Sequence, residues 1–206
     1  PNGGECDVGS VNIAYQSAIG ELPSPTKYGY DFVGWFTEKD GGEEITSKTI
    51  VELDAIYYAH WVKHVYTVAF DPNGGECDVE SINVVYQDAI GELPIPTRDG
   101  CISAGWFTEK DGGEEITSET IIESDVTYYV HWTPISYSIS YLNLRGMNNP
   151  NPSTYTILDA ITFLPLSEAS GLRFVGWDKP SIALGSIGDI TVTASWEECE
   201  LQDIVD

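Results

Sequence analysis

The chain has 206 residues, of which 33 are Asp or Glu and only 9 are Lys or Arg, giving a formal net charge of −24. A surface this acidic repels phosphate backbones and anionic lipid headgroups, so nucleic acids and membrane surfaces are excluded as expected partners. No apolar run reaches the roughly 18 to 20 residues of a transmembrane helix, and no charged-then-apolar signal opens the chain.

One unit is repeated along the chain, twice closely and a third time in diverged form. Residues 1–62 and 72–133 share 43 of 62 aligned positions at an offset of 71 residues. The third copy keeps this offset from about Tyr137, but its last strand ends 64 residues after Trp132. Such self-similarity is typical of tandem-repeat proteins. We expect four parts: repeat 1 (1–62), repeat 2 (63–133), repeat 3 (134–198) and a C-terminal linker or tail (199–206).

Each repeat is expected to open with a strand, a tight turn and a second strand. Alternating apolar residues in 66–71 and 137–142 predict half-buried strands. Asn-Gly-Gly at 73–75 can adopt positive φ and so turns the chain into a hairpin. Repeat 1 begins inside this turn, so we expect its opening strand to be missing, while its second strand should run through Val11, Ile13 and Tyr15. Repeat 3 replaces the turn by a longer segment, Leu144 to Pro152, for which a different structure is expected.

The middle of each repeat predicts a crossover, a strand and a polar loop. Two prolines in 18–26, and again in 89–97, disfavour both helix and central strand, so these segments should cross over in extended form. Alternation in 29–35 predicts a strand that carries a tryptophan into the core. A polar, glycine-broken hairpin loop should follow. One short helical turn capped by Ser118 is the most helix that the pattern allows.

Each repeat is expected to end in an alternating strand, at 55–61, 126–132 and 190–196. Two tryptophans recur per repeat. They could form sugar-stacking platforms, but each lies in the buried phase of a strand, so we expect them to be buried and to pack within their own repeat. The six are Trp35, Trp61, Trp106, Trp132, Trp177 and Trp196.

The outward phase of the last strand supplies the candidate site residues. Tyr58 and His60 in repeat 1, and Tyr129 and His131 in repeat 2, are candidates for a face that contacts a partner. The alternative is ordinary exposed strand surface.

Catalytic and metal chemistry are not expected. Glu43 and Glu44, which recur as Glu114 and Glu115, point apart as neighbours on a loop and are absent from repeat 3, so a glycosidase carboxylate pair is disfavoured. The acidic loops lack the ligand spacing of a known calcium loop and are interpreted as solvated tips. His60 and His131 recur once per unit, with no second His or Cys at ligand spacing, which disfavours zinc. No catalytic, metal-binding or cofactor-binding residue is assigned.

The four cysteines do not recur as a disulfide framework, because no pairing repeats with the unit. Free thiols are the favoured interpretation. A bridge between Cys77 and Cys101 inside repeat 2 is the open alternative.

The ordered motifs NGG, LPxPTxxGYxFxGW and YYAHW resemble the Listeria-Bacteroides repeat, also called the internalin B-type repeat, over about residues 1–196. The resemblance implies small β-grasp-like modules of about four strands, on surface-exposed, secreted or wall-attached bacterial proteins. It assigns no catalytic residue. Repeat 2 departs from it at Cys101 and Ser103, where repeat 1 has Tyr30 and Phe32, so the core of repeat 2 should be weaker.

These observations predict a mainly β protein, made of tandem small β-grasp-like modules in an extended array with low helix content. The predicted function is a non-enzymatic, acidic stalk or spacer of a bacterial cell-surface or secreted protein, located outside the cell, which presents another domain. The alternative is an adhesion module that binds a host protein or a glycan through exposed strand faces. A monomer is expected, without a cofactor and without membrane insertion.

Overall fold

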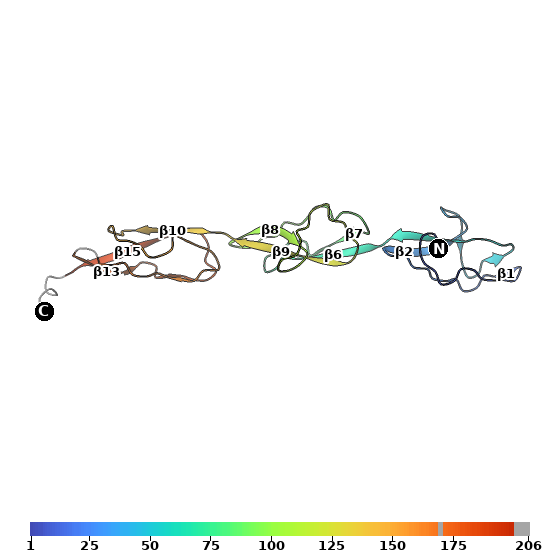
Figure 1. Cartoon of the computed structure of the whole chain (residues 1–206), viewed down its shortest axis with the longest axis horizontal. Helices are drawn as coiled ribbons and strands as arrows, with labels where there is room; N and C mark the ends of the chain where they lie inside the picture. Colours follow the sequence, from blue (N-terminus) through green and yellow to red (C-terminus); the bar gives the residue numbers. More distant parts are fainter. Residues whose placement is uncertain (169–170, 200–206) are drawn as a thin grey trace. The chain divides into compact units, whose positions relative to one another are not determined.

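The computed structural model describes residues 1–168 and 171–199, and Figure 1 traces the chain from its N-terminus to its C-terminus. Its contacts group the chain into two compact units. Unit 1 contains Pro1–Asp71, Val79–Pro94 and Glu114–Tyr128, and unit 2 contains the remainder. Unit 1 therefore joins repeat 1 to part of repeat 2, and unit 2 joins the other part of repeat 2 to repeat 3. The division into three domains stays a prediction.

The regular structure is all strand, and no helix occurs in the two described ranges. This confirms the mainly β class. The strands are β1 Ser17–Ala18, β2 Tyr30–Phe36, β3 Glu44–Ile45, β4 Ile50–Val51, β5 Tyr58–Lys63, β6 Val65–Asp71, β7 Ser81–Val85, β8 Cys101–Phe107, β9 Val126–Pro134, β10 Tyr137–Leu142, β11 Thr154–Tyr155, β12 Ile161–Thr162, β13 Leu172–Trp177, β14 Ser181–Ile182 and β15 Ile190–Glu198.

The sheet of repeat 3 has its first and last strands at the centre. The order is β11-β10-β15-β13, with β10 parallel to β15 and both outer strands antiparallel to their neighbours. Repeat 2 has the same order, β7-β6-β9-β8. A parallel pair needs a long crossover, and here extended, proline-containing chain makes it instead of a helix. This is the β-grasp-like arrangement that the resemblance implied.

Repeat 1 has a smaller sheet, with the order β3-β2-β5. The second strand predicted through Val11, Ile13 and Tyr15 does not form, so that prediction is wrong. The reason lies in the pairing of repeat 2, where β7 is an antiparallel partner of β6, as in Tyr66 opposite Val84. Among the described residues of repeat 1, no strand takes the position of β6, and the backbone of 11–15 joins no ladder.

Small cores lie inside the repeats. Ala59, Val130 and Ala194, at equivalent positions of the last strands, are only 0%, 0% and 1% exposed. In repeat 1 the buried cluster is Ile19, Trp35, Ile45 and Ala59. In repeat 3 it is Ile139, Tyr155, Phe163, Ile182 and Val192.

Tryptophan burial is confirmed for two of the six side chains. Trp35 and Trp106 are 8% and 3% exposed, whereas Trp61, Trp132, Trp177 and Trp196 are only half-buried. The indole nitrogens of three of these four donate to a carbonyl of the opening turn, so the rings sit at the end of the core where water reaches them. The pairs are Trp61 to Pro1 (3.0 Å), Trp132 to Pro72 (2.9 Å) and Trp196 to Asn143 (2.8 Å).

The opening turn holds the last strand through an asparagine. Asn2 and Asn73 both have positive φ, and their amides donate to the carbonyls of Ala59 and Val130, at 3.1 and 3.0 Å. Repeat 3 was expected to differ here, and its turn is longer. Asn143 nevertheless also has positive φ and donates to Ala194 at 2.7 Å. The same contact is therefore built on a different turn.

The helical turn predicted after Ser118 is absent. Residues 118–122 instead form a turn and one isolated bridge, between Ala89 and Ile121. Ile122, 1% exposed, enters the core from this extended segment. Cys6, Cys101 and Cys199 are free thiols, so the bridge between Cys77 and Cys101 does not form.

Candidate functional site

The predicted partner face lies on two equivalent strands. Tyr58 and His60 are half-buried on β5, and Tyr129 and His131 are half-buried on β9. Within each pair the two residues are separated by one position and therefore share a face of their strand. They are half-buried rather than fully exposed, and their role as a partner face stays a prediction.

The histidines of this face anchor the acidic loop. The His60 ring stacks on Phe36, with centroids 3.9 Å apart, and its Nε2 lies 3.0 Å from the carbonyl oxygen of Glu38. His131 repeats this arrangement, stacked on Phe107 at 3.9 Å and 3.0 Å from the carbonyl oxygen of Glu109. These contacts explain why a histidine recurs at this position, without the need to assume a bound ligand.

Repeat 3 supports this structural interpretation. Its last strand carries Ser195 at the histidine position, and the TEKDGGEE loop is replaced by another sequence. There the Asp178 carboxylate, at the position of Phe36, accepts a hydrogen bond from the Thr193 amide at 2.7 Å. The histidine disappears together with the loop that it anchors.

The acidic loops are held by their backbones. Thr37 donates its amide to the Glu43 carbonyl at 3.0 Å and accepts the Glu43 amide on its hydroxyl at 2.9 Å. The carboxylates of this loop are exposed. Among the described residues, no three His, Cys, Asp or Glu side chains are grouped closely enough to hold a metal ion.

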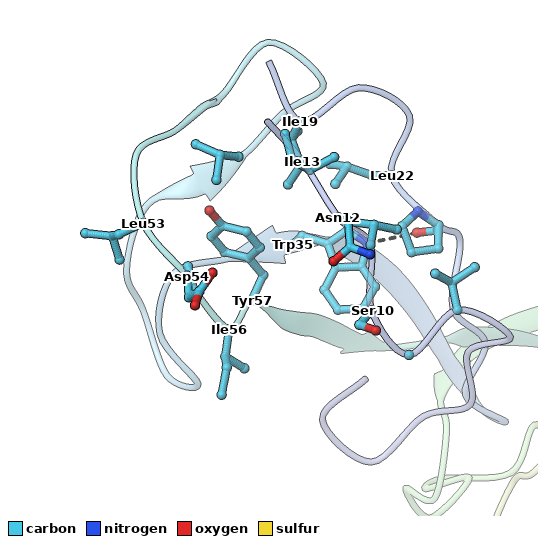
Figure 2. Close-up of a pocket in the computed structure, with 16 residues that line it drawn as sticks. Ser10, Asn12, Ile13, Ile19, Leu22, Trp35, Leu53, Asp54, Ile56 and Tyr57 are labelled. Carbon is cyan, nitrogen blue, oxygen red and sulfur yellow. Dashed lines mark hydrogen bonds between the residues drawn. The ribbon is translucent and has the colours of Figure 1, made fainter. Parts of the chain in front are cut away.

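A pocket of about 490 Å³ lies in repeat 1 (Figure 2). Trp35 and Tyr57 line it, and Leu53 and Ile56 at its rim point away from Trp35 and are 72% and 73% exposed. One wall is the segment Asp54–Tyr57, whose counterpart in repeat 3 pairs in parallel with β10. The pocket therefore has the position that an opening strand occupies in the other repeats.

Two further sites, which sequence reasoning missed, lie where consecutive repeats meet. We call the contact of repeats 1 and 2 the first junction, formed by Gly29, His64 and Tyr86, all within unit 1. The contact of repeats 2 and 3 is the second junction, formed by Gly100, Ile135 and Ile157, all within unit 2.

The first junction packs a tyrosine onto a glycine. Gly29 has φ +73°, and a Cβ at this position would lie 2.2 Å from the ring of Tyr86. Tyr86 is only 7% exposed. Three tyrosine rings meet it edge to face, which is a favoured geometry for aromatic pairs. They are Tyr28, Tyr30 and Tyr66, with centroids 5.6, 5.7 and 6.2 Å from that of Tyr86.

Backbone hydrogen bonds fix the register of the first junction. The His64 amide donates to the Gly29 carbonyl at 2.9 Å, and the Tyr86 amide donates to the His64 carbonyl at 2.8 Å. The linker residue is thereby bonded to the repeat on each side. Desolvation by burial raises the pKa of the Tyr86 hydroxyl, so the ring stays neutral at physiological pH.

Polar side chains surround this contact. The His64 ring lies 2.8 Å from the Asp31 carboxylate, and the Lys63 ammonium lies 2.9 Å from Asp88. The Tyr28 hydroxyl donates to the carbonyl of Glu123 at 3.0 Å. All these groups are exposed enough for solvent to weaken the ion pairs.

The second junction keeps the geometry and changes the side chains. Gly100 has φ +69°, and a Cβ there would lie 2.1 Å from a methyl carbon of Ile157 and 3.0 Å from one of Ile187. Ile157 is the counterpart of Tyr86 at the 71-residue offset. The Ile135 amide donates to the Gly100 carbonyl at 2.8 Å, as His64 does to Gly29. The sequence signal that could have revealed the junctions is the glycine that recurs at one position of every repeat, as Gly29, Gly100 and Gly171.

Comparison with known proteins agrees with this repeat architecture. The Listeria-Bacteroides repeat domain matches residues 1–60 and 66–131. A relative from Evansella cellulosilytica, whose name suggests a Gly-rich membrane protein, is 30% identical over 208 residues, covering 95% of this chain and 24% of the relative. Internalin H of Listeria monocytogenes is 31% identical over 152 residues, covering 71% of this chain and 25% of that protein. The chain thus spans about a quarter of the length of these relatives.

In residues 1–168 and 171–199, no helix is long and apolar enough to cross a membrane.

Proposed function

Because the chain belongs to the Listeria-Bacteroides repeat family, we propose that it is a non-enzymatic repeat region of a bacterial cell-surface protein and acts as a spacer that presents another domain. The surface location is supported by the similarity to internalin H and to relatives whose names suggest membrane proteins. The observation that carries the spacer role is the packed junction between consecutive repeats.

A spacer must hold the domain that it presents at a fixed distance, and flexible linkers between the repeats would prevent this. At the first junction the linker residue His64 is hydrogen-bonded to both repeats, and Tyr86 is buried against Gly29. The second junction repeats the glycine contact with Ile157. Packed contacts of this kind restrict hinge motion, whereas a solvated Gly- or Ser-rich linker would allow it.

The variation of the outward strand face supports a non-enzymatic role. The positions of Tyr58 and His60 carry Tyr129 and His131 in repeat 2, but repeat 3 has Thr193 and Ser195 there. A fixed chemistry would require the same side chains wherever the site is repeated. One buried position of the same strands, in contrast, stays small and apolar in all three repeats, as Ala59, Val130 and Ala194.

Adhesion is the second candidate function, favoured by a shallow groove of about 610 Å³ in repeat 1. Trp61, Tyr30 and Phe32 line it together with Lys27, whose ammonium lies 4.0 Å from the Tyr30 ring centroid. Aromatic faces beside a polar rim are suited to sugar rings. Binding on a glycan array that is lost in Lys27→Ala and retained in the repeat 2 counterpart Arg98→Ala would support adhesion; no binding by the native chain would remove this candidate.

Small-angle scattering tests the spacer proposal. A compact domain of this length has a radius of gyration of about 17 Å, and an unfolded chain one of about 50 Å. An array of packed repeats should give an intermediate value that does not change with ionic strength. A radius of gyration of about 17 Å, or one that changes with ionic strength, would contradict the proposal.

A further inference from the structure

The second junction exposes aliphatic side chains where the first junction has polar ones. Four positions change in this way, aligned at an offset of 71 residues and, for the last pair, of 64 residues. The first junction has Asp31, His64, Gln87 and Glu123, and the second has Ile102, Ile135, Leu158 and Ile187. Because repeats 2 and 3 are already packed together here, the exposure of these side chains is what remains after the junction has formed.

Three of the four aliphatic side chains are more than half exposed. The exposed fractions are 62% for Ile102, 66% for Leu158 and 54% for Ile187, and nearby Leu184 is 68% exposed. We call these four residues, together with half-buried Ile135, the aliphatic patch. All five belong to unit 2.

Contacts at the Gly100 turn bring one half of the patch together. Methyl carbons of Ile157 and Ile187 would lie 2.1 and 3.0 Å from a Cβ at Gly100, so these two side chains meet at the turn. The Gly185 amide donates to the Ile157 carbonyl at 2.8 Å. This hydrogen bond holds the segment that carries Leu184 next to the segment that carries Leu158.

The other half of the patch follows from the first junction. Ile102 and Ile135 occupy the positions of Asp31 and His64, whose side chains lie 2.8 Å apart. The Ile135 amide is bonded to the Gly100 carbonyl, as the His64 amide is to that of Gly29. The five side chains thus border one turn, and a contiguous exposed apolar surface of this kind marks an interaction site.

The charges beside the patch are mainly acidic. Asp99, Asp159 and Asp189 adjoin its chain segments and are exposed. Arg98 is the one basic residue in 98–102, 135, 157–159 and 183–189. Its guanidinium packs on the opening turn of repeat 2, 3.7 Å from the Cβ position of Gly74. An apolar surface with an acidic border attracts apolar groups that are flanked by positive charge.

We propose that the aliphatic patch binds a short segment of another protein that has an apolar centre and Lys or Arg on both sides. Apolar contact supplies the affinity, and the flanking cations face the acidic border. The site differs in place and in chemistry from the groove of repeat 1, and its occupation is independent of the spacer role.

A second copy of the chain fits this patch less well. A stable protein interface takes about 20 to 30 residues on each side, whereas the patch has five aliphatic side chains. Each copy also carries a net charge of −24, so two copies repel one another. A short basic segment has neither difficulty, and a small contact of this kind is expected to be weak and transient.

Peptide binding to the full chain tests the proposal. The probe is a fluorescent synthetic peptide with alternating leucine and valine at its centre and two lysines at each end. Anisotropy should give a dissociation constant of about 10 μM to 1 mM. Binding should weaken as salt rises from about 0.05 M to about 0.5 M, because the charges are exposed. In NMR spectra the methyl resonances of Ile102 and Leu158 should shift on binding.

Two control peptides separate the apolar and the ionic parts of the contact. One keeps the lysines and has serines at its centre, and the other keeps the apolar centre and has glutamates at its ends. Both should bind about tenfold or more weakly than the probe, since each lacks one of the two interactions.

Variants of the chain locate the site. Leu158→Gln copies the residue of the first junction, and Ile102→Asn removes an apolar side chain without adding charge. Each should weaken binding of the probe about tenfold, as the loss of one buried aliphatic contact does. Ile95→Gln is the matched control. It changes an aliphatic side chain of the same unit that is 86% exposed but lies outside the patch, and it should bind as the native chain does.

Four outcomes overturn the proposal. The first is a native chain that does not bind the probe at about 1 mM. The second is a serine-centred peptide that binds as tightly as the probe. The third is unchanged affinity in both Leu158→Gln and Ile102→Asn. The fourth is self-association of the native chain in sedimentation that Leu158→Gln abolishes, which would make a second copy the occupant.

Discussion

The two junctions use the same backbone and different side chains. At the first, Tyr86 packs on Gly29 within a cluster of tyrosine rings, and His64 faces Asp31. At the second, Ile157 packs on Gly100, and the positions of His64 and Asp31 are taken by Ile135 and Ile102. The glycine, its positive φ and the hydrogen bond to its carbonyl are common to both. The geometry of the contact is thus set by the backbone, while its chemistry varies from aromatic and ionic to aliphatic.

The largest expected effect comes from removing the ring that packs on Gly29. Tyr86→Ala should lower the free energy of unfolding by about 3 to 5 kcal/mol, as deletions of buried aromatic side chains do. Tyr15→Ala, at the exposed equivalent position, should change it by no more than about 0.5 kcal/mol. Urea unfolding of the two variants measures the difference. Equal costs would show that the first junction contributes little to stability.

A second pair of variants isolates the close approach at the glycine. Gly29→Ala and Gly171→Ala both place a Cβ at φ +73°, which costs about 1 to 2 kcal/mol for an L residue. Only Gly29→Ala also meets the Tyr86 ring, so it should cost about 1 to 3 kcal/mol more, as overpacking does. Chemical denaturation checks this order, and a Gly171 variant as unstable as the Gly29 variant would contradict it.

The ion pair of the first junction should matter less than the packing. The His64 and Asp31 side chains are 42% and 55% exposed, and exposed pairs contribute about 0 to 1 kcal/mol. The double variant His64→Ile with Asp31→Ile copies the second junction and should change stability by less than about 1 kcal/mol. A double-mutant cycle in low and high salt measures the coupling. A loss of unfolding free energy comparable to that of Tyr86→Ala would show that the ion pair, rather than the packing, stabilises the junction.

The smallest expected effect concerns the stability of repeat 3 in acid. The Asp189 carboxylate accepts the Ser138 amide at 2.8 Å, and this hydrogen bond lowers the pKa of Asp189 below its usual 3.8. Its contribution to stability is therefore present above pH 3.8 and is lost as the pH falls through the lowered pKa. Asp189→Asn should flatten the fall of stability that the native chain shows between about pH 4 and pH 2. An acid limb identical to that of the native chain would argue against this assignment.

The sequence pattern correctly predicted the structural features that depend on residues close together along a strand. The repeats, the mainly β class and the burial of Trp35 and Trp106 all follow from periodicity and motif order. The second strand of repeat 1 was mispredicted, because apolar alternation at Val11 and Ile13 does not supply a pairing partner. Strand formation depends on a ladder, and a ladder needs two segments.

The junctions were missed for a related reason. Gly29, Gly100 and Gly171 recur at the same place, but a recurrent glycine can mean a turn, a close approach or both. Only the positions of Tyr86 and Ile157 show that a side chain of the following repeat lies against it. The histidines of the predicted partner face show the same difficulty, since the stacking of His60 on Phe36 joins residues 24 positions apart.

The central claim is that the first junction holds repeat 1 and the adjoining part of repeat 2 as one body. Backbone residual dipolar couplings measured for residues 1–63 and, separately, for 79–94 and 114–128 test it most directly. The account predicts alignment tensors of the same magnitude and orientation for the two sets in the native chain, and different magnitudes in Gly29→Ala. Tensors that already differ in magnitude in the native chain would show independent motion of the repeats and contradict the claim.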